Sequence, residues 1–162
     1  MKKVILVFLL IILTMFISSK NDMIRIRVLA NSNSEYDQKV KMQIVDIVKK
    51  EFKSILKDTN DIDDARDNIN ANLNELSNKV DSFLADNNIE YKSKINFGLN
   101  YFPAKEYKGK IFEDGYYESV LVTLGQGSGD NWWCILFPTV CLNDSNVKYE
   151  SLIKKIYTKI LG

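Results

Sequence analysis

The residue types best suited to chemistry or recognition are concentrated between residues 125 and 141. This stretch holds three of the seven glycines, both tryptophans and both cysteines of the chain. Glycine permits positive φ angles that other residues avoid, and tryptophan is common among the side chains that dominate protein interfaces. The stretch is therefore either an unusual structural corner or a recognition surface.

Histidine is absent from all 162 residues. This absence removes the commonest general base, the Ser-His and Cys-His nucleophile pairs and most zinc sites. We predict no catalytic residue, no metal site and no cofactor. The enzymatic alternative that stays open is a cell-wall hydrolase, which needs two carboxylates facing one cleft. Its candidates lie in the second half of the chain: Glu106, Glu113, Glu118 and Asp130.

The glycines at 125, 127 and 129 share only their composition with a phosphate-binding loop. Such a loop continues into a lysine and a hydroxyl residue at the start of a helix, whereas Asp130 and Asn131 follow here. The net charge of +1 gives no reason to expect the basic face that nucleic acids require. Neither a nucleotide nor a nucleic acid is therefore an expected ligand.

The amino terminus has the features of an export signal. Lys2 and Lys3 precede residues 4–17, in which Thr14 is the only polar residue. As a helix this run is about 21 Å long, shorter than the roughly 30 Å hydrocarbon core of a bilayer. No small residue occupies the position preferred for cleavage, so we expect residues 1–19 to be a signal peptide or a signal-anchor. Residues 20–162 then form a single extracytoplasmic domain, with residues 4–17 as a membrane anchor if the signal is retained.

Export affects the interpretation of the cysteines. Disulfides persist outside the cytoplasm, and six residues separate Cys134 from Cys141, with Phe137 and Pro138 able to turn the chain between them. We predict a disulfide between the two cysteines. Two buried free thiols are the alternative.

The residues before this stretch predict one strand and two helices. Residues 23–30 alternate apolar with charged positions, including Arg25 and Arg27, as a strand with one buried face does. Ser34, with Asp37 three residues on in capping-box position, caps a first amphipathic helix that ends near Leu56. Residues 58–61 end this helix and cap a second, which stops at residues 86–88.

The second half of the chain predicts strands and a last helix. Alternation over residues 89–101 and β-branched and aromatic residues over 117–124 indicate strands, and residues 131–137 are expected to be the hairpin partner of 117–124. Residues 148–161 form an amphipathic helix that packs on the sheet or lies on a membrane surface. The order predicts an α+β fold: a two-layer sandwich with two long helices and a C-terminal helix on a mainly antiparallel sheet.

Trp132 and Trp133 are neighbours on the expected last strand. Successive side chains of a strand point to opposite faces, so one tryptophan anchors the core while the other stands on the outer face. The outer one, next to the glycines, is a candidate for binding a protein partner. Burial of both rings, with no partner, is the alternative.

Several motifs resemble the stage II sporulation protein R family. Residues 24–32 are similar to the opening signature of that family, and residues 131–138 with Cys141 look like its most specific motif. Further similarities are Phe102-Pro103, Lys105, Tyr107, Gly115, Tyr117 and residues 125–127. The resemblance covers residues 23–142, and the departures at Asp114 and Thr139 are modest.

The resemblance implies a secreted signal rather than an enzyme. Proteins of this family are expected in the space between the forespore and mother-cell membranes, where they activate a membrane-bound aspartic protease that processes a sigma-factor precursor. The partner-binding candidates lie on the glycine loop, the last strand and the first strand: Gly127, Gly129, Asn131, Trp132, Trp133, Arg25 and Arg27. A wall-active hydrolase or wall-binding module is the competing hypothesis.

Overall fold

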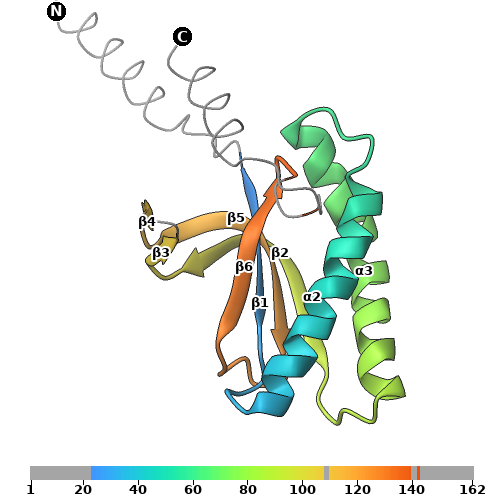
Figure 1. The fold of residues 1–162 in the computed structure, drawn as a ribbon. Helices are drawn as coiled ribbons and strands as arrows, with labels where there is room; N and C mark the ends of the chain where they lie inside the picture. The colour runs from blue at the N-terminus through green and yellow to red at the C-terminus, as the bar shows by residue number, and fades with distance from the viewer. Residues whose placement is uncertain (1–22, 108–109, 140–141, 143–162) are drawn as a thin grey trace, which may run out of the picture.

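The computed structural model describes residues 23–107, 110–139 and 142, with the backbone alone at 105–107 and 110–112. The predicted export signal at 1–19 and the predicted helix at 148–161 lie outside the described residues. The described chain forms a sheet with a pair of helices on one face (Figure 1).

The helix α2 (Glu35–Ile55) begins where its cap was predicted. Ser34 has an extended backbone conformation, and its hydroxyl accepts a hydrogen bond from the Asp37 N–H at 3.1 Å. Apolar residues at three- and four-residue steps then bury one side of the helix, among them Val40, Ile44 and Phe52.

The helix α3 (Ile62–Asp86) begins directly after residues 58–61, the segment that was predicted to cap it. The Asp61 carboxylate accepts hydrogen bonds from the N–H groups of Asp63 and Asp64, each at 2.9 Å. This contact satisfies backbone donors that have no partner within the first helical turn. The buried stripe of α3 includes Ile69 and Leu76.

The main sheet contains four strands in the order β2-β5-β1-β6. These are β1 (Ile24–Leu29), β2 (Ser93–Phe102), β5 (Gly115–Leu124) and β6 (Asn131–Phe137). β1 runs parallel to β5 and antiparallel to β6, and β2 runs antiparallel to β5. The short strands β3 (Lys105–Tyr107) and β4 (Lys110–Phe112) form a separate antiparallel pair between β2 and β5.

The α+β class is correct, but the predicted sheet and helix count are wrong. The sheet is mixed, with the parallel pair β1–β5 at its centre, and the described residues contain two helices rather than three on a mainly antiparallel sheet. The α2–α3 pair connects β1 to β2, and the β2–β5 hairpin returns the chain beside β1 in the parallel direction. Alternation within a strand does not encode which strand becomes its neighbour.

The predicted hairpin between residues 117–124 and 131–137 is also wrong. β6 pairs with β1, so β1 lies between β5 and β6. Residues 125–130 therefore cross the end of β1, and this path brings the glycines against the segment that follows β1.

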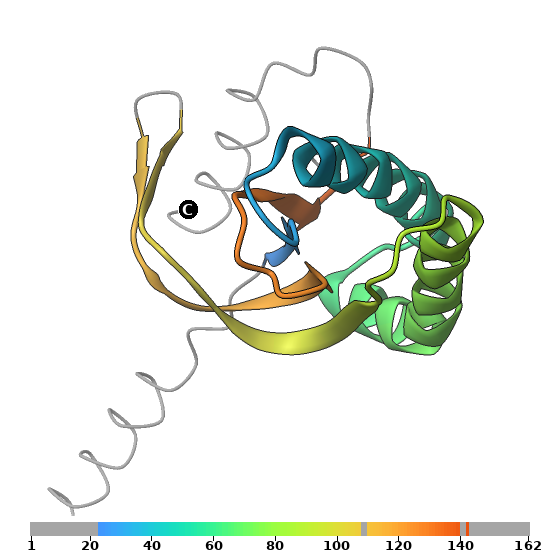
Figure 2. The same ribbon diagram turned by 90° about the horizontal axis from the view of Figure 1, so that it is seen from below.

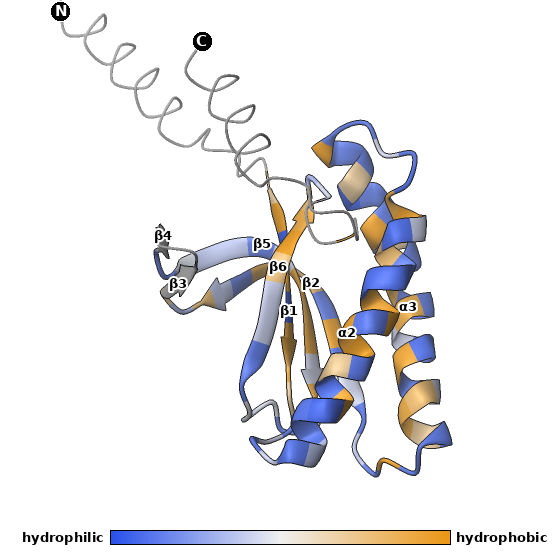
Figure 3. Cartoon of the chain, viewed as in Figure 1, coloured by the Kyte–Doolittle hydropathy of each residue, from blue (hydrophilic) through white to orange (hydrophobic). Residues whose placement is uncertain are grey.

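The core lies between the helices and one face of the sheet. Ile24, Ile26 and Val28 of β1 are fully or almost fully buried against the helices, as are Val120 and Val122 of β5. Figure 3 shows the apolar stripes of the helices and the alternation in the strands. No helix in the described part of the chain has the length and apolar character needed to cross a membrane.

The β2–β5 hairpin extends past the helix layer and bends, with β3 and β4 at its far end (Figure 2). The described helices cover one face of the sheet, and the opposite face lies on the inside of this bend. All four strands of the main sheet thus place side chains on the face that no helix of the described residues covers.

Candidate functional site

The two tryptophans of β6 point to opposite faces. Trp132 pairs with Val28 and packs against the hydrophobic core, on the helix side of the sheet. Trp133 pairs with Arg27 on the face opposite the helices α2 and α3, and its ring centroid lies 5.9 Å from the Arg25 guanidinium carbon. Trp132 is thus a core residue, and Trp133 is the tryptophan available to that face.

Arg25 is a buried cation surrounded by aromatic rings. Its side chain is only 6% exposed, and its guanidinium carbon lies 3.4 Å from the ring centroid of Tyr117 and 5.6 Å from that of Phe102. Burial lowers the pKa of Arg25, while Tyr117 acts in the opposite direction. Arginine remains protonated at neutral pH despite such shifts, so Arg25 serves as a charged centre that orders the rings.

Arg27 is more accessible and binds neutral oxygen atoms. Its Nη1 donates to the Tyr101 carbonyl oxygen at 2.9 Å, and this hydrogen bond is exposed. With the Asn131 amide oxygen turned toward it, Arg27 also donates from Nε at 3.2 Å and from Nη2 at 3.1 Å. Burial lowers the pKa of Arg27, and Phe102 lies 5.6 Å from its guanidinium carbon.

These side chains form one continuous surface, which we name the arginine–aromatic face. It consists of Arg25, Arg27, Phe102, Tyr117, Asn131 and Trp133. Four of the seven predicted partner-binding residues meet here, namely Arg25, Arg27, Asn131 and Trp133. Phe102 and Tyr117 were not among the predicted site residues, since strand pairing between distant segments brings them to the arginines.

The glycine loop is bound to the segment that follows β1. Gly129 N–H donates to the Ala30 carbonyl at 3.0 Å, and the Ser128 hydroxyl donates to the Asn31 carbonyl at 2.7 Å. The Asn31 side-chain oxygen accepts from the Gln126 N–H at 3.0 Å. The loop is therefore packed and hydrogen-bonded along most of its length.

Steric contacts explain two of these glycines. Gly127 has a φ of +64°, and a Cβ there would lie 2.5 Å from the Thr123 methyl group. A Cβ on Gly129 would collide with the backbone carbonyl of Ser32. Both predicted site glycines thus have a packing role, at the end of the sheet beyond the arginine–aromatic face.

A buried carboxylate of α2 joins the segment after β1 to the segment after α3. Asp37 is 6% exposed and accepts hydrogen bonds from Ser32 Oγ at 2.5 Å, Asn31 Nδ2 at 2.9 Å and Tyr91 OH at 2.9 Å. Burial alone raises the pKa of Asp37, but the hydrogen bonds from Ser32, Asn31 and Tyr91 outweigh it and hold the pKa below its usual value. Burial, with Asp37 nearby, raises the pKa of Tyr91.

This Asp37 cluster was missed in the sequence. The cap at Ser34 correctly predicted the Asp37 N–H contact, but a capping-box side chain would return to the cap residue. The Asp37 carboxylate instead binds Asn31, Ser32 and Tyr91. The polar run after β1 is the one sequence feature that could have indicated partners for Asp37. Nothing in the sequence near Tyr91 indicates the hydrogen bond from Tyr91 to Asp37.

The outer side of the β2–β5 hairpin carries exposed apolar side chains. Leu99 is 71% exposed, Tyr116 69% and Tyr101 48%. The two tyrosine rings meet edge to face with centroids 5.6 Å apart, and Tyr101 OH donates to Asp114. These residues form a second surface, which lies on the opposite side of the hairpin from the arginine–aromatic face.

The candidate carboxylates of a hydrolase do not converge in the described structure. Glu118 accepts hydrogen bonds from Arg66 Nε at 2.7 Å and Nη2 at 2.8 Å, on the helix side of the sheet. Asp130 lies in the glycine loop, where its N–H donates to Asn33. Glu113 is exposed before β5, and the Glu106 side chain is outside what is described.

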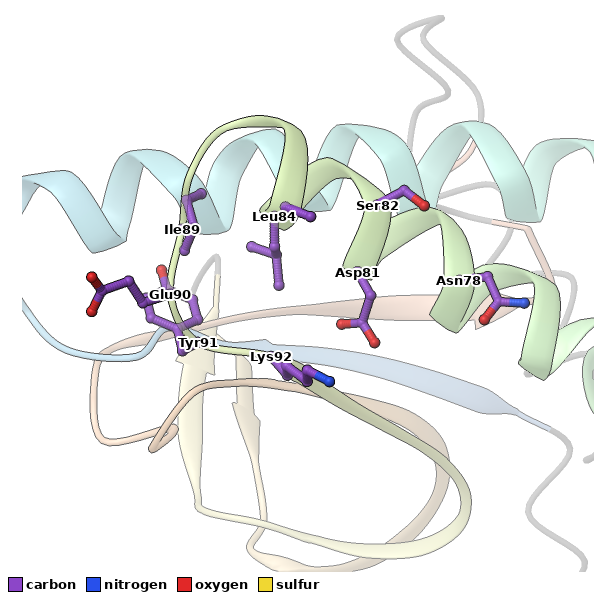
Figure 4. Close-up of a pocket in the computed structure, with 9 residues that line it drawn as sticks. Asn78, Asp81, Ser82, Leu84, Ile89, Glu90, Tyr91 and Lys92 are labelled. Carbon is purple, nitrogen blue, oxygen red and sulfur yellow. The ribbon is translucent and has the colours of Figure 1, made fainter.

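A cleft of about 460 Å³ lies between the end of α3 and the start of β2 (Figure 4). Asp81 is among its lining residues, and the Asp81 carboxylate accepts bonds from the N–H and hydroxyl of Ser93 at 3.0 and 2.8 Å. Asp81 thus anchors the first residue of β2 to α3. Within the residues that the structure describes, no cluster of three or more acidic or cysteine side chains is placed to hold a metal ion.

The predicted disulfide involves one described cysteine. Cys134 packs against the core on the helix side of β6. Cys141 lies outside the described residues, so the bond between them stays a prediction.

Comparison with known proteins identifies the relatives of this chain. The family model described as stage II sporulation protein R matches residues 20–147. The stage II sporulation protein R of Bacillus subtilis (strain 168) is 39% identical over 121 residues, which cover 75% of this chain and 54% of that relative. No solved structure matches. The chain, which spans about half the length of this relative, belongs to the stage II sporulation protein R family.

Proposed function

We propose that this chain is an exported signalling protein of sporulation. In this proposal it acts between the forespore and mother-cell membranes, where it activates a membrane-bound aspartic protease that processes a mother-cell sigma-factor precursor. Membership of the stage II sporulation protein R family carries the proposal. The apolar segment at residues 4–17 supports export.

The arginine–aromatic face supports recognition of a protein. Arginine, tryptophan and tyrosine are the residues most often found at the energetic centre of interfaces, and all three types meet on this face. Activation requires that the signalling protein bind the active state of the protease more tightly than the inactive state. A rigid face supported by the sheet is well suited to such discrimination, because little ordering accompanies binding.

Reconstitution tests the proposal directly. The purified chain is added to membranes containing the aspartic protease, and cleavage of the sigma-factor precursor is followed. We expect cleavage to depend on the added chain and to saturate with its concentration. Equal cleavage without the chain would refute the proposed activation.

Trp133→Ala and Trp132→Ala separate binding from folding in the same assay. Trp133→Ala is expected to reduce activation while unfolding remains cooperative, because Trp133 lies on the arginine–aromatic face. Trp132→Ala is expected to lower the free energy of unfolding, since Trp132 packs against the core. Full activation by a folded Trp133→Ala variant would remove this residue from the binding surface.

The hydrolase hypothesis is tested by carboxylate replacement. Glu106→Gln, Glu113→Gln, Glu118→Gln and Asp130→Asn are each assayed for activation and for release of fragments from purified cell wall. We expect no wall cleavage by the unmodified chain. Wall cleavage that one of these substitutions abolishes would favour the enzyme.

The proposal includes a disulfide between Cys134 and Cys141. The chain is purified from the exported fraction and denatured. Before reduction it should contain no thiol that reacts with an alkylating reagent, and after reduction it should contain two reactive thiols. Two reactive thiols before reduction would contradict the disulfide.

A peripheral membrane contact through residues 148–161 also enters as a proposal. The basic residues of this segment suit an anionic lipid surface. Co-sedimentation of the chain with anionic vesicles, compared with a chain truncated at residue 147, tests it: equal co-sedimentation of the two chains would contradict the contact.

A further inference from the structure

The arginine–aromatic face has a charge imbalance that indicates the chemistry of its partner. Alternation in the four strands places Arg25, Arg27 and Lys94 on this side of the sheet. The four strands β1, β2, β5 and β6 direct no acidic side chain of the described residues to this side. A partner surface of opposite charge is favoured there.

Arg27 is the residue on this face best placed to contact a partner. A guanidinium has five N–H donors, and Arg27 uses three of them on the Tyr101 carbonyl and the Asn131 amide oxygen. Within the described part of the chain, one N–H on each Nη is left for another acceptor, and no carboxylate pairs with Arg27. The existing contacts fix the plane of the guanidinium without neutralising its charge.

Resting on the proposed function, we propose that Arg27 binds a carboxylate from an acidic segment of the partner protein. The aspartate or glutamate side chain accepts from the Nη groups of Arg27, next to the half-buried ring of Trp133, while the buried Phe102 ring lies 5.6 Å from the Arg27 guanidinium carbon. Arginine binds carboxylates through two N–H groups in a fixed geometry, and Asn131 and the Tyr101 carbonyl position that geometry. Arg25 contributes by ordering the rings rather than by touching the partner.

A protein carboxylate fits this face better than a lipid headgroup. Recognition of anionic membranes usually depends on clusters of four to eight lysines or arginines. The described strands direct three cations to this side of the sheet, namely Arg25, Arg27 and Lys94, and Arg25 is buried among aromatic rings. Partly buried charge next to aromatic side chains is typical of a protein contact.

Two matched variants distinguish the site from general charge. Arg27→Gln removes the proposed contact, whereas Lys94→Gln removes one positive charge from the same side of the sheet, away from Arg27. In the reconstituted protease assay, Arg27→Gln should raise the concentration for half-maximal activation about tenfold or more, as expected for a partly buried charge pair. Lys94→Gln should change it less than about threefold, as expected for a peripheral charge. Arg27→Lys keeps the charge but not the two-pronged geometry and should give an intermediate value.

A second measurement does not depend on the protease. The full chain, labelled with ¹⁵N in a non-ionic detergent, is titrated with the peptide acetyl-Gly-Glu-Glu-Gly-amide and followed through the Arg27 Nε–H and Trp133 indole N–H resonances. We expect both resonances to shift saturably with this peptide and neither to shift with the Gln-Gln analogue. In the Arg27→Gln variant, the acidic peptide should no longer shift the Trp133 resonance. Lys94→Gln should behave as the unmodified chain does.

The two experiments fail in different ways. If the unmodified chain does not activate the protease but binds the acidic peptide at Arg27, the proposed function is wrong and the carboxylate site stands. If Arg27→Gln activates normally, or if the peptide gives no saturable shift, the site is overturned. Equal shifts with inorganic phosphate or anionic vesicles would also overturn the site, in favour of a lipid headgroup. Shifts that depend only on the concentration of the chain would overturn it in favour of a second copy of the chain.

Discussion

At the scale of single residues, the buried Asp37 carboxylate accepts side-chain hydrogen bonds from Asn31, Ser32 and Tyr91, the last of them 54 positions away in the chain. Asp37→Asn replaces one carboxylate oxygen by an amide N–H₂, so at least one of the donors from Asn31, Ser32 and Tyr91 loses its acceptor. Because hydrogen bonds to a buried charged group are strong, we expect a loss of about 2–3 kcal/mol in the free energy of unfolding. Urea unfolding followed by circular dichroism measures it.

Glu35→Gln is the matched control for this substitution. Glu35 is an exposed acid in the same first turn of α2, so its replacement should change the free energy of unfolding by less than about 0.5 kcal/mol. Equal losses in the two variants would show that helix-terminus electrostatics, rather than the buried cluster, explains the effect.

The lowered pKa of Asp37 also predicts a pH dependence. A carboxylate whose folded-state pKa lies below its unfolded-state value adds stability above the unfolded pKa and loses it as pH falls through the folded pKa. The stability difference between the unmodified chain and Asp37→Asn should therefore be full at neutral pH and shrink below about pH 4. A difference that stays constant down to pH 2 would contradict the assigned ionisation.

Local residue roles were predictable where they depend on neighbours in the chain. Ser34 caps α2 as predicted, and Asp61 caps α3 from within the predicted capping segment 58–61, because the donor and acceptor are two or three residues apart. The Asp37–Tyr91 contact joins the start of α2 to the segment after α3. Such a contact follows from tertiary packing, which residue type and spacing do not specify.

At the scale of elements, the glycine loop packs closely against residues 30–33, and substitutions in the loop measure how much this close approach stabilises the fold. In Gly129→Ala the added methyl collides with the Ser32 carbonyl and lies 3.0 Å from the Ala30 Cβ. Because backbone atoms cannot move aside as a flexible side chain does, we expect a loss of about 2 kcal/mol in the free energy of unfolding. Faster amide hydrogen exchange at residues 126–130 should accompany it.

Ser128→Ala is the control within the same loop. It removes the hydroxyl that donates to the Asn31 carbonyl, but the Ser128 N–H still donates to that oxygen at 3.2 Å. The expected loss is about 1 kcal/mol or less. A Gly129→Ala variant as stable as Ser128→Ala would mean that the loop can separate from residues 30–33 at little cost.

The boundaries of the elements were easier to predict than their neighbours. Periodicity correctly located α2, α3, β2 and β5. It placed β6 beside β5, since two strands joined by a short loop usually pair, whereas here β1 lies between them. The six residues from Gly125 to Asp130 are long enough to cross one strand, and their bonds to residues 30–33 compensate for the lost hairpin turn.

At the scale of the whole molecule, Arg66 and Glu118 join the helix layer to the sheet. Arg66 of α3 binds Glu118 of β5 through two N–H groups, with side-chain exposures of 23% and 19%. Glu118 is the first cause of the raised pKa of Arg66. A double-mutant cycle with Arg66→Gln and Glu118→Gln should give a coupling free energy of about 1 kcal/mol, since the pair is bidentate but partly solvated.

The ion pair between Lys79 and Glu75 provides a comparison. It lies within α3 and is more exposed than the Arg66–Glu118 pair, so its coupling should be smaller and should disappear first as salt is added. Equal coupling and equal salt dependence in the two pairs would show that the contact between layers adds nothing beyond a surface ion pair.

The molecule as a whole was predictable in class but not in its sheet. Buried apolar positions such as Ile26 and Val120 follow from alternation, and so does the opposite orientation of Trp132 and Trp133. That Arg25 meets Tyr117 and Phe102 depends on the strand order, because these residues belong to three different strands. The candidate site could therefore be predicted as residues but not as a surface.

The position of β1 inside the sheet has a consequence for the timing of folding. β1 leads the described chain, yet both of its neighbours come late, since Arg25 pairs with Ser119 and Ile24 with Phe137. The four-stranded sheet is therefore incomplete until β6 is available. Strand pairings between segments so far apart in the chain also form slowly. For the exported protein that we propose, the arginine–aromatic face is complete only after the last strand has been delivered across the membrane, because Asn131 and Trp133 belong to β6.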